Sequence, residues 1–289
     1  MQSVLVTGGT GRLGRAVVDR LDNLGCEVKV LTRRVPGPGA AMAAQSVVGD
    51  LRTAEGLDDA VRGASVIVHC ATTYGKGDVA AVRHLIEASV RAGGEPHLIF
   101  VSIVGADAIP VAYYRAKVAA EQMVRASELP WTIQRATQFH DLVASLFSRQ
   151  RLMPFMLTLN GFRFQPIGVG EVADRLTDLA RGAPTGRAPD IGGPQVRTMQ
   201  DLAMTFDAVN GRRRRIVSLP TPGRILRGFT SGANLAPDNA FGKGWPSSPS
   251  SPLSSADTFL FRREGFTVGL GSTWAWPTTP PFPRLRRHD

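Results

Sequence analysis

The sequence predicts an α/β protein built on a doubly wound parallel sheet, with a smaller C-terminal lobe and a tail of low order. Short β-branched and aliphatic segments alternate with helix-like segments from residue 3 to about residue 134. This alternation is typical of parallel strands joined by right-handed crossover helices. The first strand also leads directly into a glycine-rich turn. Because ligands of such sheets bind at the carboxyl ends of the strands, we expect the functional residues there.

The predicted strands and helices follow one another regularly. Six strands are expected at residues 3–7, 27–32, 46–48, 65–70, 97–102 and 131–134. Four helices connect them, at residues 15–24, 57–62, 78–92 and 113–127. In the lobe, helices are expected at residues 141–150, 169–181, 199–209 and 222–231, and short strands at 189–193 and 216–218. The sheet domain would comprise residues 1–140, and the lobe of residues 141–243 would be interleaved with it.

The glycine-rich turn has the spacing of a dinucleotide-binding site, because Gly9-x-Gly11-x-x-Gly14 and Gly8-x-x-Gly11-x-x-Gly14 overlap in it. The first glycines permit a tight turn with positive φ, the middle one lets the backbone approach a pyrophosphate, and the last lets helix and strand pack closely. The N–H groups and dipole of the following helix would face the phosphate. A turn that binds nothing is the alternative. The candidate cofactor-binding residues here are Thr7, Gly8, Gly9, Thr10, Gly11, Arg12, Leu13 and Gly14.

Two arginines indicate the form of the cofactor. An acidic residue about 20 positions after the glycines binds the ribose 2′-hydroxyl of NAD, whereas arginine suits the 2′-phosphate of NADP. Arg33 and Arg34 follow the second predicted strand, and no acidic residue takes this place. The sequence therefore predicts NADP(H) in preference to NAD(H). Two surface arginines without a ligand are the alternative.

Further cofactor contacts are expected at the ends of the third and fourth strands. Asp50, followed by Leu51, ends the third strand, where its carboxylate could accept a hydrogen bond from the adenine amino group. Capping of the next helix is an equally good interpretation of Asp50. Cys70, Ala71 and Thr72 follow the fourth strand at the same predicted edge.

A serine, a tyrosine and a lysine form a candidate catalytic set. Ser102 ends the fifth strand, and Tyr113 and Lys117 lie one turn apart on one face of the next predicted helix. A phenol with a pKa of about 10 is a poor acid near neutral pH, but a nearby ammonium lowers that pKa. Tyr113 would then exchange a proton with the substrate oxygen. Ser102 would orient a carbonyl, and Lys117 would also hold the nicotinamide ribose. Packing of Tyr113 and solvation of Lys117 is the alternative.

These residues resemble the short-chain dehydrogenase/reductase superfamily, in its atypical and extended branch near the NmrA-like and nucleoside-diphosphate-sugar epimerase-like proteins. The resemblance rests on the glycine motif with Ser102, Tyr113 and Lys117, and covers about residues 1–243. It implies a Rossmann fold, NAD(P) binding and hydride transfer at nicotinamide C4. Two features depart from typical members. The spacing from Ser102 to Tyr113 is slightly shorter, and His69-Cys70-Ala71-Thr72 replaces an asparagine-containing segment.

The segment after the sixth strand is where related proteins begin the substrate pocket, and its candidates are Thr137, Gln138 and Phe139. His140 is interpreted as structural. Residues 141–150 and 152–159 could form a lid. Bulky apolar side chains favour an apolar substrate, although core packing explains them equally well. They are Met153, Phe155, Met156 and Phe162.

These features favour an NADPH-dependent oxidoreductase that reduces a carbonyl or quinone-like small molecule. Two alternatives stay open: a non-catalytic NADP(H)-binding redox sensor of the NmrA type, and a nucleotide-sugar epimerase or dehydratase. The sequence leaves the substrate, the direction of reaction and the oligomeric state undetermined.

Composition narrows the setting and the partners. The formal net charge is +10, and the densest basic cluster is residues 212–215. We expect this cluster to be a solvated loop and expect no nucleic-acid partner. No apolar run approaches the roughly 20 residues of a membrane span, and no signal peptide is recognisable, so a cytoplasmic protein is expected. The two cysteines are expected to be reduced and buried, and the five histidines lack metal-ligand spacing, so no metal is expected.

The last stretch, residues 244–289, departs from the rest of the chain. Proline and serine are dense there and no period is sustained, so we expect low order. A partner-binding tail is one interpretation. The preferred hypothesis is a frameshift near codon 243, because the resemblance ends where relatives would carry a tryptophan-containing terminal helix. Translation of the other two reading frames tests it.

Overall fold

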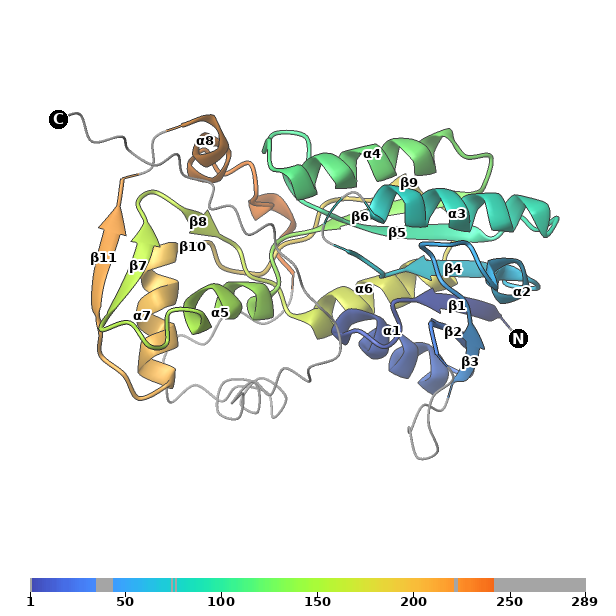
Figure 1. The fold of residues 1–289 in the computed structure, drawn as a ribbon, viewed down its shortest axis with the longest axis horizontal. Coiled ribbons are helices and arrows are strands. Elements are labelled where there is room, and N and C mark those ends of the chain that lie inside the picture. Colours follow the sequence, from blue (N-terminus) through green and yellow to red (C-terminus); the bar gives the residue numbers. More distant parts are fainter. Residues whose placement is uncertain (1, 35–43, 74, 76, 221–222, 242–289) are drawn as a thin grey trace. The chain divides into compact units, whose positions relative to one another are not determined.

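Seven parallel strands form the main sheet of the computed structural model, which describes residues 2–34, 44–73, 75, 77–220 and 223–241 (Figure 1). The strand order is β3-β2-β1-β4-β5-β6-β9. The strands are β1 Ser3–Thr7, β2 Glu27–Thr32, β3 Gln45–Val48, β4 Val66–His69, β5 His97–Ile103, β6 Trp131–Ala136 and β9 Gly186–Arg187. The chain runs outward from β1 to β3 and then returns to β4, so the switch point lies between β1 and β4. The fold is therefore Rossmann-like.

Helices cover both faces of this sheet (Figure 1). Helices α1 Arg12–Asn23 and α6 Val169–Arg181 pack on one face, and α2 Leu57–Val61, α3 Gly77–Arg91 and α4 Ala112–Ala126 pack on the other. Strand β1 illustrates the two-sided burial. Val4 and Val6 belong to the core under α1 and α6, whereas Leu5 belongs to the core under α3 and α4. The middle of β1, residues 4–6, is apolar throughout, rather than alternating, because both faces of the strand are buried.

The remaining elements form the smaller lobe, which has two two-stranded sheets of its own. Strands β7 Phe155–Leu159 and β11 Arg215–Leu219 pair in parallel, and β8 Arg163–Phe164 pairs antiparallel with β10 Arg197–Thr198. The lobe helices are α5 His140–Ser148, α7 Met199–Val209, α8 Arg224–Thr230 and a short 3₁₀ helix, Pro237–Asn239. Two elements of residues 141–243, which we expect to be interleaved with the sheet domain, contribute to the main sheet: β9 is its edge strand and α6 packs on one face.

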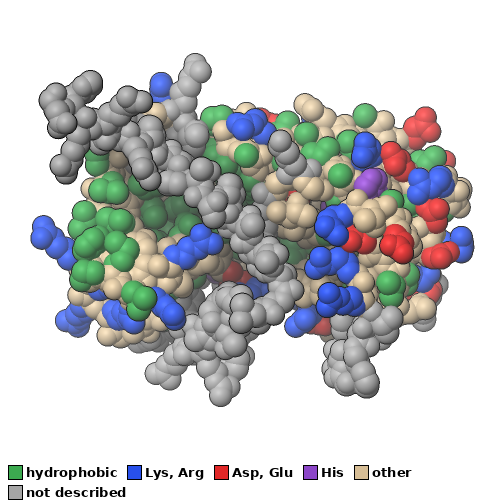
Figure 2. Space-filling model, in the orientation of Figure 1, with side chains coloured by type: hydrophobic (Ala, Val, Ile, Leu, Met, Phe, Trp, Pro, Cys, Tyr) green, Lys and Arg blue, Asp and Glu red, His purple; other side chains and the backbone are tan. Residues whose placement is uncertain are grey.

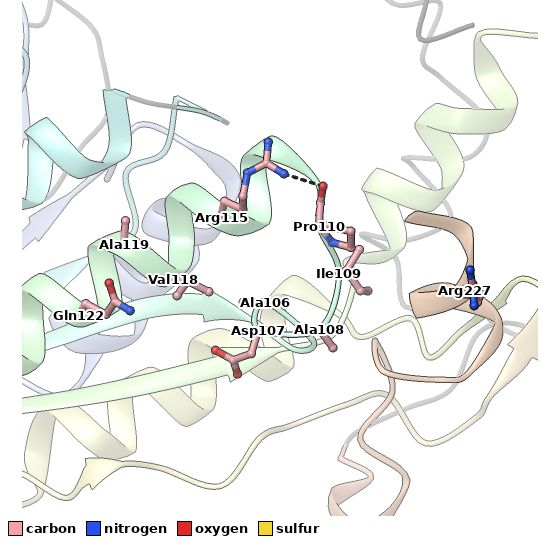
Figure 3. A pocket seen from close by; sticks show the side chains of 10 residues that line it. All are labelled: Ala106, Asp107, Ala108, Ile109, Pro110, Arg115, Val118, Ala119, Gln122 and Arg227. Carbon is pink, nitrogen blue, oxygen red and sulfur yellow. Dashed lines mark hydrogen bonds between the residues drawn. The ribbon is translucent and has the colours of Figure 1, made fainter. Parts of the chain in front are cut away.

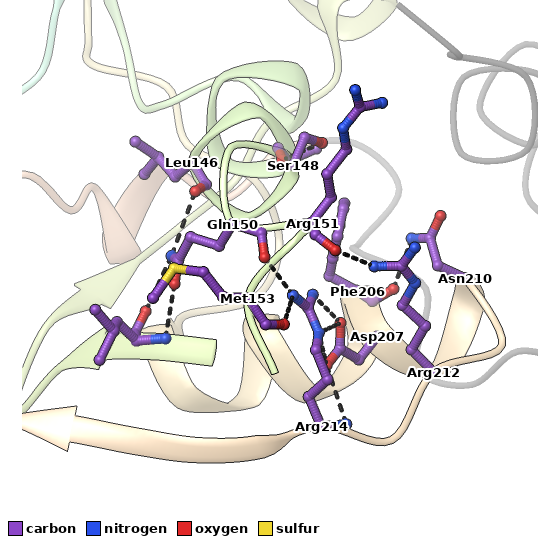
Figure 4. A network of polar contacts seen from close by, with 12 residues as sticks. Leu146, Ser148, Gln150, Arg151, Met153, Phe206, Asp207, Asn210, Arg212 and Arg214 are labelled. Carbon is purple, nitrogen blue, oxygen red and sulfur yellow. Dashed lines mark hydrogen bonds and ion pairs between the residues drawn. The ribbon is translucent and has the colours of Figure 1, made fainter. Parts of the chain in front are cut away.

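An arginine ties the lobe elements together (Figure 4). The Arg214 guanidinium pairs with the buried Asp207 carboxylate of α7 and donates to the Gln150 carbonyl at 2.5 Å. Arg212 donates to the Arg151 carbonyl at 2.6 Å. The expectation of a solvated loop at residues 212–215 is therefore wrong for Arg214, whose side chain is 10% exposed. Its charge is compensated inside the lobe, which a sequence pattern of four arginines does not reveal.

One other expectation is also wrong. Residues 189–193 do not form a strand: Ile191 and Gly192 make isolated bridges, and the strand that joins the sheet is β9. A segment of five residues with two glycines does not reveal its neighbours in the sheet. Residues 155–159 of the expected lid form β7, which is paired with β11, and the lid stays a prediction. The predicted tail, residues 244–289, lies outside the described residues.

The N-terminus of α7 is closed by a capping box. The Thr198 hydroxyl accepts from the Asp201 amide at 3.1 Å, and the Asp201 carboxylate accepts from the Thr198 amide. Within the described part of the chain, none of the helices combines the length and apolarity that crossing a membrane requires. On the face seen in Figure 2, acidic and basic side chains are interspersed over the end that carries α2 and α3.

We predict that Asp207→Asn lowers the free energy of unfolding by about 3 kcal/mol, because it leaves the mostly buried Arg214 without its carboxylate. The matched control is Asp59→Asn. Asp59 also pairs with an arginine, Arg62, but both side chains are exposed, so its loss should change stability by less than about 1 kcal/mol. Urea denaturation of the two variants measures the difference. Equal effects would contradict the structural role of Arg214.

Candidate active site

The turn between β1 and α1 and the first turn of α1 leave no room for a side chain at Gly8 and Gly14. Gly8 has a φ of +70°, and a Cβ on it would lie 2.7 Å from the Ala71 nitrogen. A Cβ on Gly14 would lie 2.2 Å from the Gly8 carbonyl oxygen. Neither clash involves a side chain that could move away. The predicted reason for these glycines, a tight turn with close packing of helix on strand, agrees with the geometry.

Helix α1 begins at this turn with its N–H groups uncapped by any side chain. Its N-cap is Gly11, and its first turn contains no acidic residue. An uncapped helix N-terminus beside a glycine turn is suited to bind an anion. Arg12, the first residue of α1, forms an ion pair with Asp141 of α5 at 2.6 Å. Thr10 is exposed, whereas Leu13 points into the core. The cradle thus fits the pyrophosphate of a dinucleotide.

The end of β4 closes the other side of the cradle. Thr7 pairs in register with His69, and the Cys70 amide donates to the Thr7 carbonyl at 3.1 Å. Ala71 meets the Gly8 turn as described above. The Thr7 hydroxyl is hydrogen-bonded to His69 Nδ1 at 2.8 Å. The predicted cofactor residues of β1 and β4 are therefore neighbours.

The two arginines proposed for the 2′-phosphate follow β2, beside β1 at the same edge. Thr7 is in register with Leu31 of β2. Arg33 and Arg34 are both exposed, and the Thr32 hydroxyl donates to the Arg34 carbonyl at 2.9 Å. These two residues thus follow the carboxyl end of β2, which is next to β1 in the sheet.

Asp50 does not cap the next helix, because the N-cap of α2 is Gly56. Asp50 Oδ1 instead accepts from the Arg52 amide at 2.8 Å and organises its own turn. That interpretation was wrong because several turn residues separate Asp50 from α2. Leu51 packs against the core under α3, and its carbonyl accepts from His84 Nδ1 at 2.8 Å. The adenine contact of Asp50 stays a prediction.

Lys117 links the first turns of α4, where Tyr113 lies, to the end of β5, where Ser102 lies. Lys117 Nζ donates to the carbonyl of Val101, the residue before Ser102, at 3.2 Å. The same nitrogen lies 5.8 Å from the centre of the Tyr113 ring. Ser102 and Lys117 are buried, and Tyr113 is half-buried. Lys117 is therefore buried, whereas the alternative interpretation expected it to be solvated.

Sequence reasoning missed Asp78. This first-turn residue of α3 is 1% exposed, and its carboxylate lies 3.4 Å from Lys117 Nζ. Thr72 donates to Asp78 Oδ2 at 2.6 Å, and the Thr73 hydroxyl donates to Oδ1 at 2.7 Å. Its only signal in the sequence is an acidic residue in the first turn of a helix, which is common. Thr72, predicted to contact the cofactor, is thus also a partner of Asp78.

Burial shifts the pKa of several groups around Lys117. Burial lowers the pKa of His69 to about 3, and the Lys117 ammonium acts in the same direction. Burial raises the pKa of the Cys70 thiol to about 12. Burial also opposes the ionisation of Asp78, but Lys117 and the hydrogen bonds from Thr72 and Thr73 outweigh it and lower that pKa. Burial lowers the pKa of Lys117, and Asp78 acts against this shift.

Two buried polar atoms at this edge have no hydrogen-bond partner among the described residues: Ser102 Oγ and His69 Nε2. A buried polar group without a partner is costly, and such groups mark places where a ligand or water completes the bonding. The cradle and these two atoms fit a dinucleotide and a polar substrate group at the carboxyl edge of the sheet.

The three candidates for the substrate pocket are engaged within the protein. The Thr137 hydroxyl donates to the Gln165 carbonyl, and Gln138 Oε1 accepts from the side-chain nitrogen Nδ2 of Asn234 at 3.4 Å. Phe139 packs against the core under α1. His140 Nε2 is hydrogen-bonded to the Pro166 carbonyl at 3.0 Å, in agreement with its structural interpretation. The roles of Thr137, Gln138 and Phe139 toward a substrate stay predictions.

A pocket of about 710 Å³ lies on the opposite side of α4 (Figure 3). Arg115, Val118, Ala119 and Gln122 line it from α4, together with the loop of residues 106–110 and Arg227. Tyr113 and Lys117 do not line it. It is therefore a surface pocket separate from the candidate active site.

Known proteins resemble this chain in sequence and in fold. The family described as NAD(P)H-binding matches residues 8–147. A (4-alkanoyl-5-oxo-2,5-dihydrofuran-3-yl)methyl phosphate reductase from Streptomyces griseus is 31% identical over 234 residues, covering 75% of this chain and 77% of that protein. A ceramide reductase from Caulobacter vibrioides is 26% identical, covering 78% of this chain and 76% of that protein.

Among solved structures, the UDP-glucose 4-epimerase of Thermotoga maritima superposes with a TM-score of 0.63 at 20% identity, covering 78% of this chain and 88% of that one. The sequence matches show that the chain belongs to the NAD(P)H-binding family. This family and the reductase-named relatives support an NAD(P)-dependent oxidoreductase.

We predict that His69 makes the protein less stable in acid. In the unfolded chain a histidine binds a proton below a pH of about 6.5, whereas buried His69 stays neutral until about pH 3. The stability that His69 contributes is full above pH 6.5 and falls toward pH 3 by up to about 1.4 kcal/mol per unit. Urea denaturation between pH 7 and 5 should show a shallower dependence in His69→Gln. Equal slopes would contradict a buried neutral histidine.

Proposed function

We propose that this protein is an NADPH-dependent reductase that transfers hydride to a carbonyl or quinone-like small molecule. The observation that carries the proposal is the buried Lys117 ammonium, which lies between the Val101 carbonyl and the Tyr113 ring. A positive charge at that place favours proton transfer by the phenol. Ser102 follows Val101, and its hydroxyl, which has no hydrogen-bond partner among the described residues, suits a substrate oxygen.

In this proposal the chain divides the chemistry among three side chains. The bound nicotinamide supplies the hydride. Tyr113 gives its phenolic proton to the substrate oxygen, so that a carbonyl becomes an alcohol, and solvent restores the proton. Ser102 donates a hydrogen bond that orients the oxygen and stabilises its developing charge. Lys117 keeps the phenol poised for transfer.

The preference for NADPH rests on charge. Arg33 and Arg34 are exposed at the edge that carries the glycine turn. Arginine binds phosphate through charge-assisted and often bidentate hydrogen bonds, and in β2-adjacent positions of such folds it accommodates a 2′-phosphate. The acidic residue that would favour NAD(H) is missing at this place in the sequence.

The proposed substrate class follows from the chemistry of the site and from the two relatives, both of which are named as reductases. The apolar side chains of the lobe add less support than expected. Met156 and Phe162 are buried within the lobe, so they serve its packing. The proposed apolar character of the substrate therefore rests on Met153 and Phe155, which are half-buried.

We predict that Tyr113→Phe reduces NADPH turnover by about two orders of magnitude or more, because it removes the proton donor. Oxidation of NADPH with a panel of quinones, aldehydes and ketones is the measurement. The matched control is the adjacent Tyr114→Phe, since Tyr114 is buried against Phe229 and should keep activity within a few-fold of wild type. NADPH binding without turnover on any compound would favour the sensor function instead.

We also predict that Arg33→Gln with Arg34→Gln weakens NADPH binding by about tenfold or more, because charge-assisted hydrogen bonds contribute about 1.5–3 kcal/mol each. NADH binding should change little, since it lacks the 2′-phosphate. Fluorescence titration of both dinucleotides measures this. Arg62→Gln, which removes another exposed charge, is the control. A wild-type protein that binds NADH more tightly than NADPH would overturn the assignment.

A further inference from the structure

We propose that Asp78 is a positioning residue of the reductase: it holds Lys117 in place and offsets its charge, so that Tyr113 stays protonated and can donate. This inference rests on the proposed function. It also specifies the direction of the reaction, because a site that keeps its phenol protonated near neutral pH favours reduction. Asp78 acts through Lys117 and need not touch the substrate.

The carboxylate of Asp78 is oriented before it meets Lys117. The Thr73 amide and hydroxyl both donate to Oδ1, and the Thr72 hydroxyl donates to Oδ2. Oδ2 is also the atom that faces Lys117 Nζ at 3.4 Å. The side chain is 1% exposed and α3 begins one residue earlier. A carboxylate fixed by three hydrogen bonds can direct a flexible lysine, whereas the reverse would not hold.

Lys117 is held from three sides. Its Nζ donates to the Val101 carbonyl at 3.2 Å, lies 4.9 Å from the centre of the Phe100 ring, and lies 3.4 Å from Asp78. It remains 5.8 Å from the centre of the Tyr113 ring. A single charge at such a distance shifts a pKa by about one to two units when the site is buried. The ion pair with Asp78 reduces this effect on Tyr113.

The other titratable groups around Lys117 do not replace Asp78. His69 at the end of β4 is neutral above its pKa of about 3, and the thiol of Cys70, the next residue, is neutral below its pKa of about 12. From α4, Tyr114 is neutral because burial raises its pKa to about 12. Glu121 of α4 makes its own ion pair with Arg135 of β6 at 2.6 Å. Of the described acidic groups that act on Lys117, Asp78 alone is directly paired with it.

Removal of the Asp78 charge should therefore lower the pKa of the Tyr113 phenol. In Asp78→Asn the Lys117 ammonium acts on Tyr113 without an opposing carboxylate, so the pKa of the phenol falls. Reduction needs the protonated phenol, so its alkaline limb moves to lower pH. Asp78→Asn keeps the shape and two hydrogen-bonding groups of the side chain. Asp78→Glu keeps the charge and should restore the limb, which a purely structural role does not predict.

The first experiment is the pH profile of kcat/KM for reduction, in wild type, Asp78→Asn and Asp78→Glu. We expect the alkaline limb of Asp78→Asn about one to two pH units lower, and Asp78→Glu closer to wild type. The control is Asp59→Asn, which removes a carboxylate from the exposed Arg62 at α2 and should leave the limb in place. An unmoved limb in Asp78→Asn would overturn the inference.

The second experiment uses the free protein and no substrate. Ultraviolet titration of tyrosinate in Asp78→Asn, with Asp78→Asn/Tyr113→Phe as the reference, reports the ionisation of Tyr113 alone. The same difference between wild type and Tyr113→Phe gives the titration midpoint of Tyr113 when Asp78 is present. We expect the midpoint of Tyr113 at lower pH in Asp78→Asn than in wild type. Equal midpoints would overturn the inference. If Asp78→Asn does not fold, Asp78→Ser gives the same comparison. If the Tyr113 midpoint shifts but the wild-type protein turns over none of the compounds, the proposed function is wrong, while the effect of Asp78 on Tyr113 stands.

Discussion

The close backbone contact at Gly8 and Gly14, where a side chain does not fit, is the constraint on which the rest of the structure depends. Gly14 lies against the Gly8 carbonyl so closely that one added carbon would displace backbone. Because α1 can approach there, it packs on α6, and the uncapped N-terminus of α1 opens at the carboxyl edge of β1. Strand β1 is central, between β2 and β4, so this contact places the elements that carry the rest of the site.

Buried ion pairs then organise what surrounds the turn. Asp78 and Lys117 join α3 to α4 beside Tyr113, and Arg135 joins β6 to Glu121 on the same helix. Burying such charges is expensive, and hydrogen bonds must compensate for the lost water. Here threonines and carbonyls provide them. The result is a set of side chains with little freedom, which suits proton transfer at a fixed place.

Most of the main sheet was predictable, because its signals are local. The bounds of β2 and α6 agree with those expected from the sequence. The spacing of apolar residues along a segment distinguishes a buried strand from an amphipathic helix without knowledge of its neighbours. The errors concern partners. Residues 189–193 are too short to identify a strand, Asp50 lies too far from α2 to cap it, and Arg214 gives no sign in the sequence that Asp207 compensates it.

The sequence by itself determined the fold class, the glycine turn and the spacing of Tyr113 and Lys117, because each follows from the order and type of neighbouring residues. The tertiary structure decided which distant groups surround them. Asp78 and Lys117 are far apart in the chain, and only the packing of α3 beside α4 brings their charges to 3.4 Å. Burial decided that His69 is neutral at physiological pH. Water is excluded there by residues from several strands and helices, and no local pattern records that exclusion.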